Sequence, residues 1–268
     1  MITTIEPYYT SKDGGFLLYC GDSTELLKKV VRPGTVDMIF ADPPYFLSND
    51  GITCRSGKMV SVNKAGWDQG LDRRGIHSFN KKWLRGCRRL LSANGTIWVS
   101  GTRHIIYSVG FAMQQIGFKL LNDIVWEKPN PPPNLSCRYF THSTETVIWA
   151  AKDEKSKHRF NYKLMRSVAG GKQMKSVWSI QAPAKSEKKL GTHPTQKPLK
   201  LLERIILASS EPGDLVLDPF VGSGTTGVAA VRHGRRFIGI DADPSCLEIS
   251  KKRYEYETAQ MKLPSAHP

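Results

Sequence analysis

The feature that most constrains the fold is a glycine-rich segment, residues 217–227, between a strand-like apolar run and a helix-like run. Its glycines at 222, 224 and 227 follow the pattern G-x-G-x-x-G, which lets the backbone turn tightly from a strand into a helix. The next apolar run ends at Asp241, 17 residues after Gly224, where a carboxylate can accept hydrogen bonds from ribose hydroxyls. The segment predicts an α/β unit with a nucleoside-binding loop, but the glycines alone do not separate NAD from S-adenosylmethionine.

A second constraint is the string Asp42-Pro43-Pro44-Tyr45, which directly follows the apolar run 36–41. The two prolines end a strand and exclude a helix, so the string predicts a stiff turn at the carboxyl end of a buried strand. Ligands bind at this end in open α/β sheets. The turn offers a carboxylate, backbone carbonyls and one aromatic ring, a set that suits an exocyclic amine on a base. We expect the turn and the glycine loop to meet at the same edge of one sheet.

Apolar periodicity extends the α/β pattern over most of the chain. Strand-like runs lie at 16–20, 36–41, 96–99, 120–126, 144–151, 215–217 and 237–240, and helical spacing lies at 23–30, 79–91, 105–116, 199–209, 225–232 and 245–256. Strands that alternate with helices predict a doubly wound, mostly parallel sheet. The polar stretch 46–78 contains five glycines and is a candidate lid, because long loops inside compact domains are usually functional.

The charge of the chain points to a polyanionic partner. The formal net charge is +15, and residues 152–192 hold eleven Lys and Arg against three Asp and Glu. We expect this segment to be an insertion that contacts phosphates rather than a core element, dividing the chain into 1–151, 152–192 and 193–268. Its aromatic residues Phe160, Tyr162 and Trp178 could stack on bases or pack the insertion's own core.

Composition also bears on location and metals. Five cysteines are scattered without metal-ligand or paired spacing, which argues against zinc and disulfides and fits a reducing cytoplasm. The first residues lack the blocks of a signal peptide, and no apolar run approaches the roughly 18 residues of a membrane span. We expect a soluble cytoplasmic protein with no metal and no membrane partner.

The acidic turn and the glycine loop together resemble the β-group DNA amino-methyltransferases. In that group the catalytic motif precedes the cofactor loop and the target-recognition region lies between them, as here. The resemblance implies a Rossmann-like methyltransferase sheet that uses S-adenosylmethionine, with a basic target-recognition insertion at 152–192. Residues 134–146 make the chain most similar to the smaller adenine methyltransferases of GATC-type restriction–modification systems.

The resemblance also implies the site residues. The catalytic residues are Asp42, Pro43, Pro44 and Tyr45. Gly21-Asp22 matches a family segment that contacts the cofactor's adenine, and 193–198 matches one beside its methionine portion. The implied cofactor-binding residues are Gly21, Asp22, His193, Thr195, Lys197, Asp218, Pro219, Phe220, Gly222, Ser223, Gly224, Thr225, Asp241 and Asp243. Lys197 could instead be simply solvated, and His142 could be a buried structural histidine.

The expected reaction is methyl transfer from S-adenosylmethionine to N6 of adenine in DNA. Asp42 and the carbonyl of Pro43 would accept both amino hydrogens, and Tyr45 would stack on the base. The target atom is inaccessible inside a duplex, so the base is either flipped out or already unpaired. Double-stranded DNA, single-stranded DNA and a homodimer all stay open.

Three alternatives compete with this hypothesis. The same fold methylates N4 of cytosine, although serine commonly replaces the leading acid in those enzymes. A nicotinamide-dependent oxidoreductase would use the glycine loop but would explain neither the acidic turn nor the basic segment. A catalytically silent DNA-binding protein would leave the motifs without a purpose.

Overall fold

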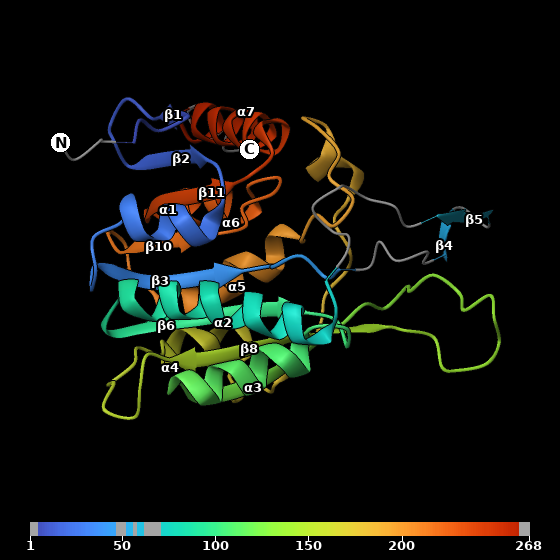
Figure 1. Cartoon of the computed structure of the whole chain (residues 1–268). Helices are drawn as coiled ribbons and strands as arrows, with labels where there is room; N and C mark the ends of the chain where they lie inside the picture. The colour runs from blue at the N-terminus through green and yellow to red at the C-terminus, as the bar shows by residue number, and fades with distance from the viewer. Residues whose placement is uncertain (1–4, 47–51, 56–57, 62–70, 263–268) are drawn as a thin grey trace.

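The computed structural model describes residues 5–46, 52–55, 58–61 and 71–262. Within these residues one sheet has nine strands, in the order β1 (Tyr9–Thr10), β2 (Phe16–Cys20), β11 (Arg236–Asp241), β10 (Leu215–Asp218), β3 (Val36–Ala41), β6 (Leu91–Gly101), β8 (Thr144–Ala151), β7 (Lys119–Glu127) and β9 (Val177–Ser179) (Figure 1). A separate antiparallel hairpin joins β4 (Ile52–Arg55) to β5 (Lys58–Ser61). The lid predicted at 46–78 falls in part on 47–51, 56–57 and 62–70, which lie outside the described residues.

The sheet is mostly parallel, which confirms the expected fold class. Strands β2, β11, β10, β3 and β6 are parallel neighbours, and β9 is parallel to β7. Within this nine-stranded sheet only the pairs β1–β2, β6–β8 and β7–β8 are antiparallel. In the register of β3 with β10, Met38 pairs with Val216 and Ile39 with Leu217. The acidic turn after β3 and the glycine loop after β10 therefore leave the same edge of the sheet side by side.

Helices cover both faces of the sheet. On one face α1 (Ser23–Lys29), α2 (Arg73–Leu90) and α3 (Ile106–Ile116) lie side by side (Figure 1), and on the other are α4 (Tyr162–Val168), α5 (Leu199–Ser209), α6 (Thr225–Arg232) and α7 (Pro244–Lys262). Along β3, Ile39 and Ala41 enter the first core, whereas Met38 and Phe40 enter the second. This burial on both faces explains why the run is apolar throughout. None of the helices in the described ranges is long and apolar enough to cross a membrane.

The basic segment 152–192 is built into the domain. It contributes α4, the edge strand β9 and the short 3-10 helix η2 (Lys185–Lys188). Met165, Trp178 and Ile180 are buried in the second core, and the Trp178 indole donates a hydrogen bond to the carbonyl of Lys175 at 2.8 Å. The expectation that this segment stays outside the core is wrong, because three short elements leave too little periodicity to detect. Trp178 is a packing residue and not a stacking surface for bases.

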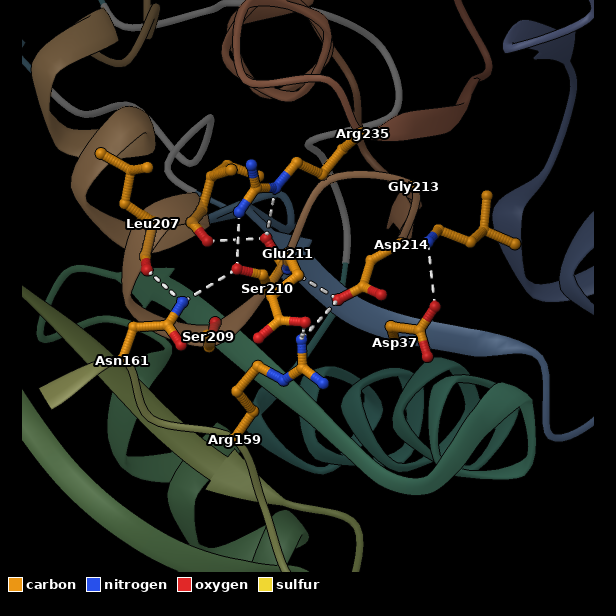
Figure 2. Close-up of polar contacts among 12 residues, drawn as sticks. Asp37, Arg159, Asn161, Leu207, Ser209, Ser210, Glu211, Gly213, Asp214 and Arg235 are labelled. Atoms are coloured by element: carbon orange, nitrogen blue, oxygen red, sulfur yellow. Dashed lines mark hydrogen bonds and ion pairs between the residues drawn. The ribbon is translucent and has the colours of Figure 1, made fainter. Parts of the chain in front are cut away.

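The first part of this segment lies at the sheet edge opposite the acidic turn. Strand β8 ends at Ala151 beside the start of β6, so the chain leaves the sheet on the far side from Asp42. There Arg159 forms an ion pair with Glu211, and the side-chain Nδ2 of Asn161 donates to the carbonyl of Ser210 at 2.9 Å (Figure 2). These contacts fasten residues 159–161 to the end of α5. The expectation of phosphate contacts across the whole of 152–192 therefore does not fit its first part.

Candidate active site

The acidic turn and the glycine loop line one cavity of about 490 Å³ at the carboxyl edge of the sheet. All predicted site residues except Gly21, Pro219 and Gly224 line it: Asp22, Asp42, Pro43, Pro44, Tyr45, His193, Thr195, Lys197, Asp218, Phe220, Gly222, Ser223, Thr225, Asp241 and Asp243. Gly21 and Pro219 lie behind the wall, where the Gly21 amide donates to the carbonyl of Asp241 at 2.8 Å and the Pro219 carbonyl accepts from the Ser23 hydroxyl. The meeting of the two motifs is the arrangement that the sequence predicts.

Two glycines of the loop are required by packing. Gly224 has φ +78°, and a Cβ there would lie 2.2 Å from Oγ of Ser250 on α7. A Cβ on Gly227 would lie 2.7 Å from the ring of Phe16, so this glycine lets α6 approach the sheet. Gly224 therefore shapes the loop from behind, whereas Gly222 faces the cavity beneath the ring of His193, which is 3.4 Å from its ideal Cβ position.

Three carboxylates that line the cavity are oriented by backbone amides. Asp241 accepts from the amides of Gly222 at 2.8 Å and Asp243 at 3.0 Å. Asp243 accepts from the Ser245 amide at the start of α7, and Asp22 caps α1. Burial raises the pKa of Asp241, while hydrogen bonds from Ser245 lower the pKa of Asp243. The arrangement presents fixed acceptors to hydroxyl and amino groups of a ligand.

Asp218 is a fourth acid at this wall and is almost fully buried. It accepts hydrogen bonds from the Thr226 hydroxyl at 2.6 Å and the Phe220 amide at 3.0 Å. Burial nevertheless raises its pKa to about 7, because no cation offsets the loss of solvation. These two hydrogen bonds stabilise the strand-to-helix turn between β10 and α6.

The acidic turn is tied to a lysine from the far end of the chain. Asp42 Oδ1 accepts from the Tyr45 hydroxyl at 2.7 Å, and Oδ2 accepts from Lys197 Nζ at 2.5 Å. Lys197 stands just before α5 and is 6% exposed. The alternative that Lys197 is simply solvated is therefore wrong. Phe46 follows the turn with φ +52°, a left-handed conformation that is uncommon for a residue with a side chain.

Two further charged residues, which the sequence interpretation missed, complete this centre. Glu145 at the start of β8 has Oε2 3.5 Å from Lys197 Nζ and Oε1 2.5 Å from Lys128 Nζ. Asp42, Lys197, Glu145 and Lys128 thus form a four-charge cluster with no formal net charge, and the Tyr45 hydroxyl also lies 3.3 Å from Glu145. An acid inside the apolar run 144–151 was the available signal for Glu145. No sequence pattern marks Lys128.

The pKa shifts follow from burial and from these pairs. Burial raises the pKa of Asp42, Lys197 opposes the rise and Glu145 adds to it. Burial would also raise the pKa of Glu145, but Lys197 and Lys128 outweigh it and lower that pKa to about 2. The two carboxylates outweigh burial at Lys197 and raise its pKa. Lys197 therefore favours the charged form of the partly buried Asp42 carboxylate, against the effects of burial and of Glu145.

Three aromatic rings line part of the cavity. The rings of Phe46 and Phe79 are 5.5 Å apart and those of Phe79 and Phe220 are 6.3 Å apart. A cavity of this size with an apolar wall and a few fixed polar groups is typical of small-ligand sites. In the ranges that the structure describes, no group of His, Cys, Asp and Glu is arranged to hold a metal ion. The cavity suits an organic ligand with a flat ring, hydroxyls and an amine.

Comparison with known proteins gives a consistent family. Residues 36–252 match the DNA methylase family of N6 and N4 methyltransferases. The chain is 56% identical over 253 residues to the Type II methyltransferase M2.DpnII of Streptococcus pneumoniae, covering 94% of this chain and 93% of the relative. The structure resembles that of the M1.HpyAVI–SAM complex with TM-score 0.63 and 27% identity, over 89% of this chain and 99% of that one. It also shares its fold with the cytosine-N4-specific PvuII DNA methyltransferase, with TM-score 0.74 and 21% identity over 98% and 91% of the two chains.

Proposed function

The chain belongs to the N6/N4 DNA methylase family, and from this premise we propose that its target is the N6 amino group of adenine. It is a site-specific DNA methyltransferase, and its methyl donor is S-adenosylmethionine. We further propose that it serves a restriction–modification system, as the Type II name of its relatives suggests. The choice of adenine over cytosine rests on Asp42, the first residue of the acidic turn.

The cavity fits the methyl donor by size and by chemistry. When bound, S-adenosylmethionine supplies a methyl group activated by a sulfonium. We assign Asp241 and Asp243 to its hydroxyls and Phe220 to its base, because fixed carboxylates and an aromatic ring line the same cavity. His193 and Thr195 lie at the other side of Gly222 and complete the cavity.

Asp42 acts on the target nitrogen. The lone pair of an exocyclic amine is delocalised into the ring, which makes the nitrogen a poor nucleophile. Asp42 accepts one amino hydrogen and the Pro43 carbonyl accepts the other, which favours a pyramidal nitrogen whose lone pair is no longer delocalised into the ring. Although Tyr45 and Lys197 already donate to Asp42, a carboxylate has about four acceptor sites. Its negative charge also stabilises the positive charge that develops on nitrogen.

Tyr45 and Lys197 position this carboxylate. The Tyr45 hydroxyl donates a hydrogen bond to Asp42, which fixes the Tyr45 ring beside the place where the target amine must lie. This position supports a role for the ring in stacking on the target base. Burial and the nearby Asp42 raise the pKa of Tyr45 well above its ordinary value, so it stays a donor. Lys197 favours the ionised form of Asp42 and opposes the rise in pKa that burial causes.

The four-charge cluster favours adenine over cytosine N4. Serine commonly leads the motif in cytosine-N4 enzymes, and a serine could not form the ion pair that Asp42 forms with Lys197 at 2.5 Å. The likeness to PvuII methyltransferase concerns the fold alone. We therefore keep cytosine N4 as the second candidate, and GATC as the first recognition sequence to test.

Mapping of modified bases tests the proposal. DNA is incubated with the protein and S-adenosylmethionine, sequenced for modified positions, and digested for nucleoside mass spectrometry. We expect N6-methyladenine in one short motif, lost in Asp42→Asn and retained in the control Asp123→Asn, which changes an exposed acid on β7. N4-methylcytosine would replace the adenine assignment. Full activity of Asp42→Asn would remove Asp42 from the mechanism.

A further inference from the structure

An open groove of about 370 Å³ adjoins the active site at the base of the loop 128–143. It is lined by Arg103 and by residues 139–144. Thr144 immediately precedes Glu145 of the four-charge cluster, and Arg103 follows β6, whose last residue Gly101 pairs with Thr146. The loop projects beyond this edge of the sheet (Figure 1). A DNA strand whose target base occupies the cavity must therefore pass close to the groove.

The groove has the chemistry of a nucleic-acid contact. Residues 128–144 include Lys128 and Arg138 but no Asp or Glu. Arg103 Nη1 lies 2.5 Å from Nε2 of His142, and the rings of His142 and Tyr139 are 5.4 Å apart. His142 is exposed, so its interpretation as a buried structural histidine is wrong. Cations next to aromatic rings match a strand of phosphates and bases.

The loop holds its aromatic residues outward in a defined shape. Phe140 is 96% exposed and Tyr139 is 58% exposed. The Asn134 side chain accepts from the amide of Ser136 at 3.1 Å and donates to the carbonyl of Tyr139 at 2.5 Å. Cys137 has φ +52°, a strained conformation for a non-glycine residue, and such strain tends to be retained at functional segments. The loop is thus braced on one side and presents a bare ring on the other.

We propose that Phe140 and Tyr139 form a stacking platform for the nucleotide next to the target base, with Arg103 and Arg138 contacting the adjacent phosphates. This proposal rests on the proposed function, because it takes the substrate to be DNA. A base that leaves its stack exposes the face of its neighbour, and an aromatic side chain can cover that face. The same contact serves a single strand, where every base offers a π face.

The test compares aromatic and aliphatic side chains at position 140. The probe is a DNA oligonucleotide carrying the mapped methylation motif, with 2-aminopurine in place of the base next to the target. We expect Phe140→Ala and Phe140→Leu to raise the KM for DNA roughly 5- to 100-fold and to reduce the quenching of the probe. Phe140→Trp should restore both. The control is Phe111→Ala, which removes a 56% exposed ring from α3, outside the groove.

The outcomes separate this proposal from the proposed function. If Phe140→Ala and Phe111→Ala share the wild-type KM and probe quenching while methylation is intact, the platform is refuted and the enzyme assignment stands. If leucine restores the KM as well as tryptophan does, an apolar contact such as a protein interface replaces stacking. If the wild-type protein neither binds nor methylates DNA, both proposals fail.

Discussion

Replacing Lys197 with methionine tests how the four-charge cluster governs Asp42. The substitution removes the ammonium 2.5 Å from Asp42 and 3.5 Å from Glu145, so Lys128 alone remains against two carboxylates. Removal of one partner from a buried ion pair typically costs about 3–5 kcal/mol of folding free energy. Asp42 can relieve this by taking up a proton, since burial and Glu145 already raise its pKa. Asp42 in the variant should therefore stay protonated up to a higher pH than in the wild-type protein.

Activity and stability should then respond to pH in opposite directions. A protonated Asp42 accepts hydrogen bonds poorly and carries no charge for the target nitrogen, so the methylation rate below the raised pKa of Asp42 should fall about 10²- to 10³-fold. The rate should recover as pH rises through the raised pKa of Asp42. A carboxyl with a raised pKa contributes stability below its unfolded pKa, and this contribution is lost as pH rises through the folded pKa. Lys197→Met should thus gain activity while it loses stability.

Single-turnover methyl transfer and urea unfolding, both measured from pH 6 to 9, check this expectation. The matched control is Lys128→Met, which removes the other ammonium of the cluster without touching Asp42 and should leave the pH–rate profile closer to wild type. Adding Glu145→Gln to Lys197→Met restores charge balance and should lower the pKa of Asp42 again. The reasoning is refuted if Lys197→Met keeps the wild-type pH–rate profile, or if its rate and stability fall together as pH rises.

Two further substitutions test the cofactor half of the site. Burial raises the pKa of Asp218 to about 7, so its contribution to stability is present below about pH 4 and is lost as pH rises through 7. Asp218→Asn should remove this pH dependence, roughly 4 kcal/mol, from the free energy of unfolding in urea. An equal dependence of the unfolding free energy on pH in both proteins would contradict this. Gly224→Ala places a Cβ 2.2 Å from Ser250 Oγ at φ +78° and should lower stability by about 2–4 kcal/mol. The control is Gly34→Ala, at a residue with a similar φ of +72° but open space around its Cβ position, and it should lose only about 1 kcal/mol. Thermal unfolding of both variants measures these losses, and equal losses would exclude the clash with Ser250.

The parts of the structure that the sequence predicts well are those decided by local chemistry. Prolines 43 and 44 end β3, and the glycine at 224 permits a left-handed turn that other residues resist. Adjacent parallel strands have their carboxyl ends at the same edge of the sheet, so the turns that follow two such strands lie close together. Strand β8 likewise has the predicted bounds, since Thr144–Ala151 contains the β-forming residues 146–149 and only one charged residue.

The segment 152–192 shows what local patterns leave out. Its elements are short, with seven residues in α4 and three in β9. Neither is long enough for the spacing of its apolar residues to distinguish a helix from a strand. Its charges suggested a surface that meets DNA, yet Arg159 is taken up by Glu211 at the far edge of the sheet. The charge of a segment indicates that some part of it is exposed to solvent. It does not state which edge of the fold the segment occupies.

The acidic turn itself depends on residues that no local motif contains. An isolated carboxylate in an apolar cavity takes up a proton, because desolvation disfavours its charged form. At Asp42 this is opposed by Lys197, 155 residues away, and both Lys197 and Lys128 pair with Glu145. With two ammonium groups for two carboxylates, each charge has an opposite neighbour and the centre as a whole is neutral. The chemistry of the tetrapeptide is therefore a property of three chain segments that only the fold brings together.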